Sequence, residues 1–288
     1  MGESVNEGVR APGPLLLMAL GLCLIAFSTS HPLLTGAVLV TSLGLTLVAP
    51  TRSTLVLVIA GIAALGVVIL NPFVQANGDL ILFELPQIPI LDTQVTLEEV
   101  VAGLVLGARA AAVTLLVMAT LALADPDRLL RLASRLAPNS ALAASIAARL
   151  VPTLRRDATL LSETSRLRGH RLASGPWRTR ARTAGALAVP LVGSSLERAV
   201  DVAEAMAVRG YGAGPRTRTP RRPFEAPDRV ILATSAVLIA IGVLSIAGVV
   251  GGFDFYPRLA PMTEAASVAA AVVVLLTGSV AVAAASRR

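Results

Sequence analysis

The sequence predicts an all-α integral membrane protein with about six transmembrane helices and a cytoplasmic domain of long amphipathic helices. The first supporting observation is composition. The 288 residues are 55% hydrophobic and 15% charged, and their mean hydropathy of +0.74 is far above that of a soluble domain. The second is the aromatic content of 3%, while Ala, Leu and Val dominate, which favours packed helices over a β-barrel with aromatic girdles. The third is the alternation of long apolar runs with charged loops.

Six apolar runs approach the roughly 20 residues that a helix needs to cross the hydrocarbon core. They are Pro14–Ser28, Pro32–Ala49, Thr54–Leu70, Leu97–Ala124, Val230–Val250 and Ala265–Ala285. The first run lacks a strongly basic leader and a small-residue cleavage site, so we expect a retained helix rather than a signal peptide. The predicted organisation is four spans in residues 1–124, cytoplasmic helices in 125–212, a basic linker in 213–229 and two spans in 230–288.

The charges of the loops predict the side of the membrane on which each loop lies, because cytoplasmic loops carry an excess of basic residues. The stretch 72–99 carries five acidic residues and no Arg, so we expect it outside. The stretch 125–229 holds 19 of the 25 arginines against nine acidic residues, so we expect it in the cytoplasm. Threading the spans alternately places both termini in the cytoplasm of a multi-pass protein of the cell (inner or plasma) membrane.

The residue types exclude several kinds of chemistry. All 25 basic residues are Arg, and without Lys the chain has neither a phosphate-binding loop of the GxxxxGKS/T type nor a Schiff base. Cys23 is the single cysteine, and His31 and His170 fall in different segments without the spacing of metal ligands. We therefore expect no catalytic residue, metal or bound cofactor in this chain, and we expect partner subunits to hydrolyse any ATP.

The cytoplasmic stretch begins with two predicted helices. The first starts at Asp125-Pro126 and stops before Pro138, because Asp is a favoured N-cap and Pro fits the first helical position. The second runs from Asn139 or Ser140 to Arg168-Gly169, and we expect a bend at Pro152.

A third cytoplasmic helix is predicted after the Gly175-Pro176 break, and it ends at Arg209-Gly210. Its apolar and charged residues lie on opposite sides, as in an amphipathic helix. The apolar side comprises Leu191, Val192, Leu196, Ala199, Val200, Ala203 and Met206, and the charged side Glu197, Arg198, Asp201 and Glu204.

The two longer cytoplasmic helices end alike, the first in Leu167-Arg168-Gly169 and the second in Val208-Arg209-Gly210. A structural interpretation is that Gly supplies a left-handed cap and that Arg favours the negative end of the helix dipole. A functional interpretation is that each Arg enters an acidic groove of a partner and forms bidentate hydrogen bonds there, while Gly permits close approach. Two copies in one cytoplasmic unit favour docking.

Three stretches carry a family resemblance. They are Ala148–Leu154, whose Arg149 and Pro152 frame an Arg-aliphatic-aliphatic-Pro core, then Arg166–Gly169, then Arg198-Ala199 through Ala205–Gly212. From about Leu97 to Gly212 the chain resembles the transmembrane (T) component of energy-coupling factor transporters, a family that includes the transmembrane subunit of cobalt importers. The last stretch is the most specific of the three.

The resemblance implies that Arg168 and Arg209 are the central residues of two X-Arg-X motifs, each of which inserts into one of two ATP-binding cassette ATPase subunits. It also implies that the helices bearing them are coupling helices that cradle a separate substrate-binding membrane subunit. The chain departs from the commonest motif, Ala-Arg-Gly, because Leu167 and Val208 replace Ala. A vitamin or a transition-metal ion is the implied cargo.

Arg109 lies inside the fourth apolar run, where a charge costs at least about 2.5 kcal/mol. One interpretation is a contact to the coupling helices or to the substrate-binding partner. The other is a structural pair with a backbone carbonyl or an acidic residue.

Two other functions compete with that of a transporter subunit. A self-contained secondary transporter needs ionisable or helix-breaking residues at mid-membrane, and apart from Arg109 the spans offer almost none. An intramembrane enzyme needs paired carboxylates, a His cluster or a nucleophile with its base, and these patterns are missing from the sequence. We expect the lipid bilayer as a partner. We expect no nucleic acid, because basic residues alternate with membrane-facing stripes and aromatic platforms are missing.

Overall fold

The computed structural model describes residues 12–49, 54–71, 81–84, 94–124, 126–168, 177–214, 226–253 and 264–286. The chain divides into two compact units. One, the membrane unit, comprises Met1–Leu129 and Pro223–Arg288, and the other, the arginine-rich unit, comprises Leu130–Arg222.

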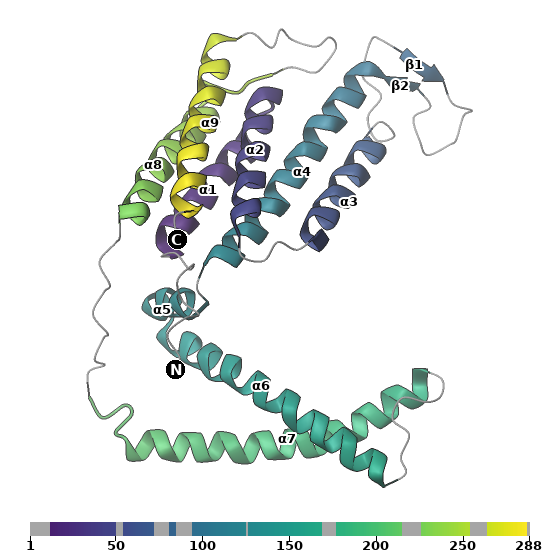
Figure 1. Ribbon diagram of the computed structural model, residues 1–288, viewed down its shortest axis with the longest axis vertical. Coiled ribbons are helices and arrows are strands. Elements are labelled where there is room, and N and C mark those ends of the chain that lie inside the picture. Colours follow the sequence, from purple (N-terminus) through teal and green to yellow (C-terminus); the bar gives the residue numbers. More distant parts are fainter. Residues whose placement is uncertain are drawn as a thin grey trace. The chain divides into compact units, whose positions relative to one another are not determined.

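The membrane unit is built from apolar helices (Figure 1). Among the described residues, three helices are long and apolar enough to cross a bilayer, and three further apolar helices have 17 residues each. The three longer helices are α4 (Leu97–Leu123), α8 (Ala226–Ile246) and α9 (Ala265–Ser286), and the shorter ones are α1 (Pro12–Ser28), α2 (Pro32–Val48) and α3 (Thr54–Leu70). The predicted all-α membrane fold is confirmed.

The end of α8 differs from the prediction by four residues, and a glycine explains the difference. The apolar run continues to Val250, but Gly248 adopts φ 74° and the Gly248 and Val249 N–H groups donate to the Ser245 and Leu244 carbonyls. This is a Schellman cap, which terminates the helix at Ile246. The beginning of α8 also differs, because Ala226 lies inside the stretch predicted as linker.

A short antiparallel ribbon, which hydropathy did not predict, precedes α4. Strand β1 (Ile81–Glu84) pairs with β2 (Gln94–Thr96), and the register shifts between Ile81 and Phe83. The ribbon leads directly into α4, where the Thr96 N–H donates to the Glu99 carboxylate over 3.0 Å. This hydrogen bond satisfies one of the unpaired N–H groups at the helix start, where negative charge is also favourable.

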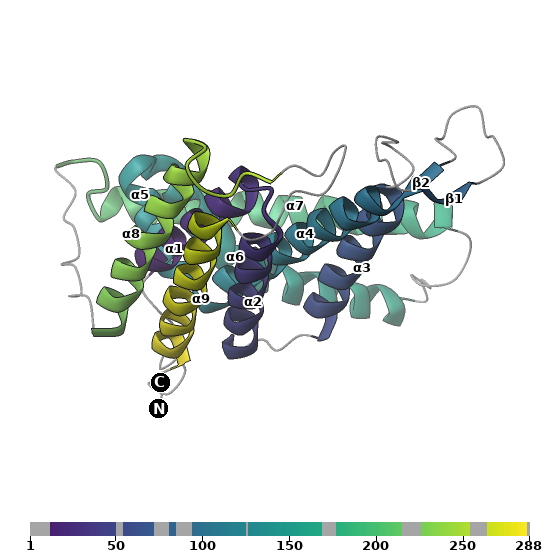
Figure 2. The same ribbon diagram turned by 90° about the horizontal axis from the view of Figure 1, so that it is seen from above.

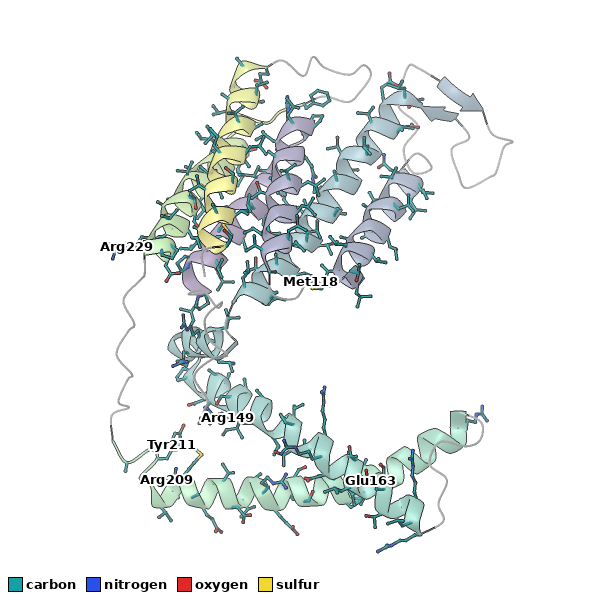
Figure 3. All side chains as sticks on the ribbon, viewed as in Figure 1. Met118, Arg149, Glu163, Arg209, Tyr211 and Arg229 are labelled. Atoms are coloured by element: carbon teal, nitrogen blue, oxygen red, sulfur yellow. The ribbon has the colours of Figure 1, made fainter. Side chains whose placement is uncertain are left out.

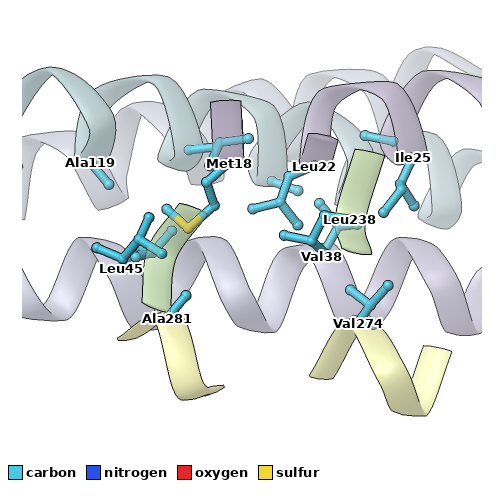
Figure 4. Close-up of a cluster of buried hydrophobic side chains, with 14 of the residues drawn as sticks. Met18, Leu22, Ile25, Val38, Leu45, Ala119, Leu238, Val274 and Ala281 are labelled. Carbon is cyan, nitrogen blue, oxygen red and sulfur yellow. The ribbon is translucent and has the colours of Figure 1, made fainter. Parts of the chain in front are cut away.

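The core of the membrane unit lies between α1, α2, α4, α8 and α9 (Figure 4). Glycines allow α1 and α8 to approach closely: a Cβ at Gly21 would lie 2.9 Å from the Leu238 Cβ, and one at Gly242 would lie 2.8 Å from the Leu24 Cβ. Small residues at helix contacts are what membrane bundles use, because packing replaces the hydrophobic effect there. Large buried side chains fill the rest, among them Met18, Leu22, Ile25, Leu45 and Leu238.

Helix α3 packs against α4 and is otherwise exposed. Gly103 and Gly107 of α4 have the small-xxx-small spacing, and a Cβ at Gly107 would lie 2.8 Å from the Ala64 carbonyl oxygen of α3. Ala60 is the one buried hydrophobic residue among the described residues of α3. The rest of the α3 surface is therefore apolar and open to lipid or protein.

The arginine-rich unit consists mainly of two long helices, α6 (Pro138–Leu167) and α7 (Trp177–Val208), which cross one another (Figures 1 and 2). The short helix α5 (Pro126–Leu136) precedes them. Pro138 occupies the first turn of α6, where its missing N–H costs nothing. Pro152 lies inside α6 and Pro190 inside α7. The predicted bend at Pro152 stays a prediction.

Candidate functional site

The end of α7 is a complete Schellman cap that fixes Arg209 at the helix tip (Figure 3). Gly210 adopts φ 75°, its N–H donates to the Ala207 carbonyl over 2.9 Å, and the Tyr211 N–H donates to the Met206 carbonyl over 2.9 Å. A side chain at position 210 would be strained in this conformation, so Gly is required by the backbone. Arg209 is exposed at the end of α7.

The end of α6 places Arg168 in a comparable position. Arg168 is the C-cap residue, with φ −80° and ψ 7°, and its N–H donates to the Thr164 carbonyl over 3.1 Å. Its side chain is exposed. Gly169 and His170 lie outside the described residues, so the structure describes the first two residues of this motif.

Each Arg follows an aliphatic side chain that is almost fully exposed. Leu167 is 90% exposed and Val208 is 89% exposed. An aliphatic side chain next to a guanidinium can bury its apolar surface in a partner while the guanidinium binds a carboxylate. We call Leu167-Arg168 and Val208-Arg209-Gly210 the two Arg tips.

An ion pair joins α6 and α7. Both terminal nitrogens of Arg198, Nη1 and Nη2, lie 3.2 Å from Oδ2 of Asp157, and both side chains are half-buried. From the sequence, Arg198 was expected on the charged side of its helix, and its pairing with Asp157 was not predicted. Partners that lie far apart in the chain and on different helices leave no periodic signal in the sequence.

One side of α7 exposes an apolar stripe. Val189, Val192, Leu196 and Val200 follow one another at spacings of three or four residues and are all exposed. Of the predicted apolar side, Leu191 and Met206 are instead half-buried. We call Val189, Val192, Leu196 and Val200 the α7 stripe.

Arg149 and Pro152, which the family resemblance singled out, are both exposed on α6.

Arg109 lies on α4 and donates through Nη2 to the Thr29 carbonyl, just beyond the end of α1. A guanidinium is favourable there, because the last carbonyls of a helix carry partial negative charge. The Nε group of Arg109 is buried without a hydrogen-bond partner. This contact matches the structural interpretation of Arg109, whose role in function stays a prediction.

His31 caps the start of α2 next to the same connection. Its Nδ1 accepts a hydrogen bond from the Leu33 N–H over 3.3 Å, and its ring lies edge-on to Phe253 with centroids 5.5 Å apart. The side chain is 1% exposed, and burial lowers the pKa of His31, while the Glu264 carboxylate opposes that shift. Burial therefore disfavours the charged form of His31.

The family model described as CbiQ, cobalt transport protein, matches residues 9–220, which is more than half of the chain. The match covers the first four apolar helices, the ion pair and both Arg tips. The chain belongs to the CbiQ family.

Curated relatives of this CbiQ-family chain are named energy-coupling factor transporter transmembrane protein EcfT. The protein of Brevibacillus brevis is 34% identical over 102 residues, which is 35% of this chain and 38% of the relative. The protein of Exiguobacterium sibiricum is 35% identical over 105 residues (36% and 39%), and that of Listeria innocua 37% identical over 99 residues (34% and 37%). The matches thus span less than two-fifths of each relative.

The resemblance to T components of energy-coupling factor transporters is confirmed by these two findings. By family, the chain is a membrane protein of the transporter class. The roles of Arg168, Arg209, Arg149 and Pro152 stay predictions, because a family match does not test single residues.

Proposed function

We propose that this chain is the energy-transducing transmembrane subunit of an ATP-driven energy-coupling factor importer of vitamins or transition-metal ions. Two ATP-binding cassette ATPase subunits hydrolyse ATP, and a substrate-binding membrane subunit carries the solute. This chain links them and binds no cofactor. The observation that carries the proposal is the pair of Arg tips, in which an exposed Arg follows an almost fully exposed aliphatic residue at the end of a long helix.

Each Arg tip docks into a groove of one ATPase subunit. The guanidinium binds carboxylates there, and burial of the Leu167 or Val208 side chain contributes about 1.5–3 kcal/mol for a fully buried aliphatic group. Because the two tips belong to one folded unit, docking of one raises the effective concentration of the other. Closure of the ATPases on ATP then moves both helices, which transmit the motion as rigid rods.

The α7 stripe is the surface on which we place the substrate-binding membrane subunit. Its four aliphatic side chains follow a helix face, which is the pattern by which a helix contacts an apolar partner. The family resemblance implies the same role for the coupling helices. Movement of α7 by the ATPases would thus reach the substrate-binding subunit directly.

The experiment that tests this function is purification of the tagged chain from membranes of its source organism in mild detergent. Mass spectrometry identifies the ATPase subunits that accompany it, and the ATPase activity of the complex is measured. The variants Arg168→Ala and Arg209→Ala should each weaken retention of the ATPase subunits, and the double variant should abolish it. Arg166→Ala is the matched control, because Arg166 is exposed in the last turn of α6 but precedes the tip.

Retention of the ATPases by the double variant at the wild-type level would contradict the docking role of the tips. Solute uptake by vesicles that contain this chain alone would contradict the whole proposal. It would favour the secondary transporter instead.

A further inference from the structure

The ion pair between Asp157 and Arg198 has no role in docking as described above, yet it joins the two helices that carry the Arg tips. Both terminal nitrogens of Arg198 share one carboxylate oxygen at 3.2 Å. The Arg198 side chain is 37% exposed and the Asp157 side chain 27%, so solvent screens the pair less than it screens two fully exposed side chains. The pair is therefore a directional contact at the place where α6 and α7 meet.

The position of the pair is the same on both helices. The number of residues from Asp157 to Arg168 equals the number of residues from Arg198 to Arg209. In an α-helix this interval makes about three turns, or about 16.5 Å, so the two arms from the pair to the tips have equal length. Three turns also return each tip residue to nearly the same helix face as its ion-pair residue.

Neither arm is interrupted by a helix breaker. Pro152 of α6 and Pro190 of α7 lie on the other side of the ion pair from the tips, so any bend that they cause falls outside the arms. The arms are regular helix to Leu167 and Val208. A change in the angle between α6 and α7 therefore moves both tips. If the helices rotate about the ion pair, the two tips move through equal distances.

The remaining contact between the helices does not define this position by itself. Near the pair in sequence, the half-buried residues include Ala158, Leu154 and Leu161 on α6 and Ser194, Ser195 and Leu191 on α7. The hydroxyl groups of both serines donate to the Leu191 carbonyl of their own helix, so their hydrogen bonds are made within α7. Contacts of small and aliphatic side chains tolerate sliding of one helix along the other, whereas a polar pair selects one register.

We propose that the Asp157–Arg198 pair is the pivot of the coupling helices and positions the two Arg tips at equal distances from their crossing. Two related ATPase subunits around a two-fold axis present two equivalent grooves. Equal arms let one chain reach both grooves with its pivot on that axis. The benefit of equal arms, which is docking to two ATPase subunits, rests on the proposed function. The role of Asp157 and Arg198 as positioning residues can be tested without any ATPase, because it concerns the geometry of the arms.

The first test measures the distance between the tips in the purified chain. Cys23 is the single cysteine, so spin labels at Leu167→Cys and Val208→Cys in a Cys23→Ala background report one pair of sites. The charge reversals Asp157→Arg and Arg198→Asp should each broaden the distance distribution at least about twofold. The double swap, Asp157→Arg with Arg198→Asp, should restore the wild-type width, because the pair is remade with opposite polarity.

The matched control is Glu163→Arg, which makes the same change of charge at an exposed position of the same arm (Figure 3). It should leave the distance distribution unchanged. Asp157→Asn provides a milder variant if a charge reversal prevents folding, and it should broaden the distribution as well. Single variants with the wild-type width, or a swap as broad as the single variants, would overturn the pivot.

The second test measures the ATPase subunits that co-purify with the full complex from native membranes. Each charge reversal should lower their retention about tenfold or more, because misplaced tips lose the benefit of binding at two points. The swap should restore retention. If the distances respond as expected but the wild-type chain retains no ATPase, the proposed function fails and the pivot stands. If retention depends on the Arg tips but the distances do not respond, the pivot fails and the proposed function stands.

Discussion

Single side chains satisfy backbone groups that lack helical partners where helices end in the membrane unit. Arg109 donates to the Thr29 carbonyl beyond the end of α1, and His31 accepts from the Leu33 N–H at the start of α2. Thr29 adds a bond from its hydroxyl to the Gly251 carbonyl, which ties the α1–α2 connection to the α8–α9 connection. An unpaired backbone group in this environment would cost free energy comparable to a lost hydrogen bond. The charged side chain of Arg109 and the polar side chains of His31 and Thr29 are therefore explained by the backbone groups that they bind near helix ends.

The His31 cap predicts a pH-dependent stability. Nδ1 can accept the Leu33 N–H only while it is unprotonated, and burial lowers the pKa of His31 below its usual 6.5. The unfolded chain therefore binds more protons than the folded chain below about pH 6.5, and stability is lost as the pH falls through the folded pKa. The melting temperature in detergent, followed by circular dichroism, should decrease as the pH is lowered from 7.5 to 5.5.

The variant His31→Asn isolates this contribution, because Asn is a favoured N-cap without a titrating group. Glu264 on the neighbouring connection and Arg109 on α4 are unchanged in it. Its melting temperature should vary less with pH than that of the wild type. Equal pH dependence in both proteins would show that other groups cause the loss.

At the scale of elements, hydropathy located the spans well because membrane burial is a property of whole runs of residues. The bounds of α2, α3 and α4 differ from the predicted runs by one residue at most. The end of α8 was missed because the apolar run does not reveal which Gly takes a positive φ. The ribbon β1–β2 was missed because its strands have three and four residues, too few for an alternating pattern.

The part of the candidate site that was predicted from the sequence consists of local motifs, and the part that was missed depends on contacts between helices. Arg168 and Arg209 stood out because the motif is local in sequence and occurs twice. The cap at Gly210 was also readable, since Gly after the last helical residue is a common signal. The Asp157–Arg198 pair and the Arg109–Thr29 bond depend on which helices meet, and no single-helix pattern contains that information.

The approach of α3 to α4 predicts the effect of a single Cβ. Gly107→Val should lower the melting temperature in detergent, because the Ala64 carbonyl oxygen lies 2.8 Å from the position of a Cβ and backbone atoms cannot rotate away. Overpacking of this kind costs about 1–3 kcal/mol. Gly61→Val on α3 is the control, since a Cβ there meets no other atom within 4 Å. Equal melting temperatures for the two variants would contradict the close contact.

At the scale of the whole molecule, the arginine distribution divides the chain into two parts with different surroundings. The membrane unit exposes apolar side chains such as Leu55, Ile62 and Leu276, as a surface in lipid should. The arginine-rich unit exposes charged side chains together with the α7 stripe. The positive-inside rule then predicts that this second unit faces the cytoplasm.

The orientation can be measured with single cysteines in a Cys23→Ala background. A cysteine at Glu204, exposed on α7, should react with a membrane-impermeant maleimide in inside-out vesicles but not in intact cells. A cysteine at Glu264, exposed before α9, should show the opposite pattern, because it lies in the predicted outer connection. Labelling of position 204 in intact cells would reverse the predicted topology.

The one-sided attachment of α3 has a consequence for how the protein senses its bilayer. A helix held along a single edge has few protein neighbours to set its tilt, so the thickness of the surrounding lipid sets it instead. With 17 residues, α3 has a length of about 25 Å, which is shorter than an average hydrocarbon core of about 30 Å. Thinner membranes should accommodate α3 at least cost, and acyl-chain length should influence the α3 edge before it influences the rest of the bundle.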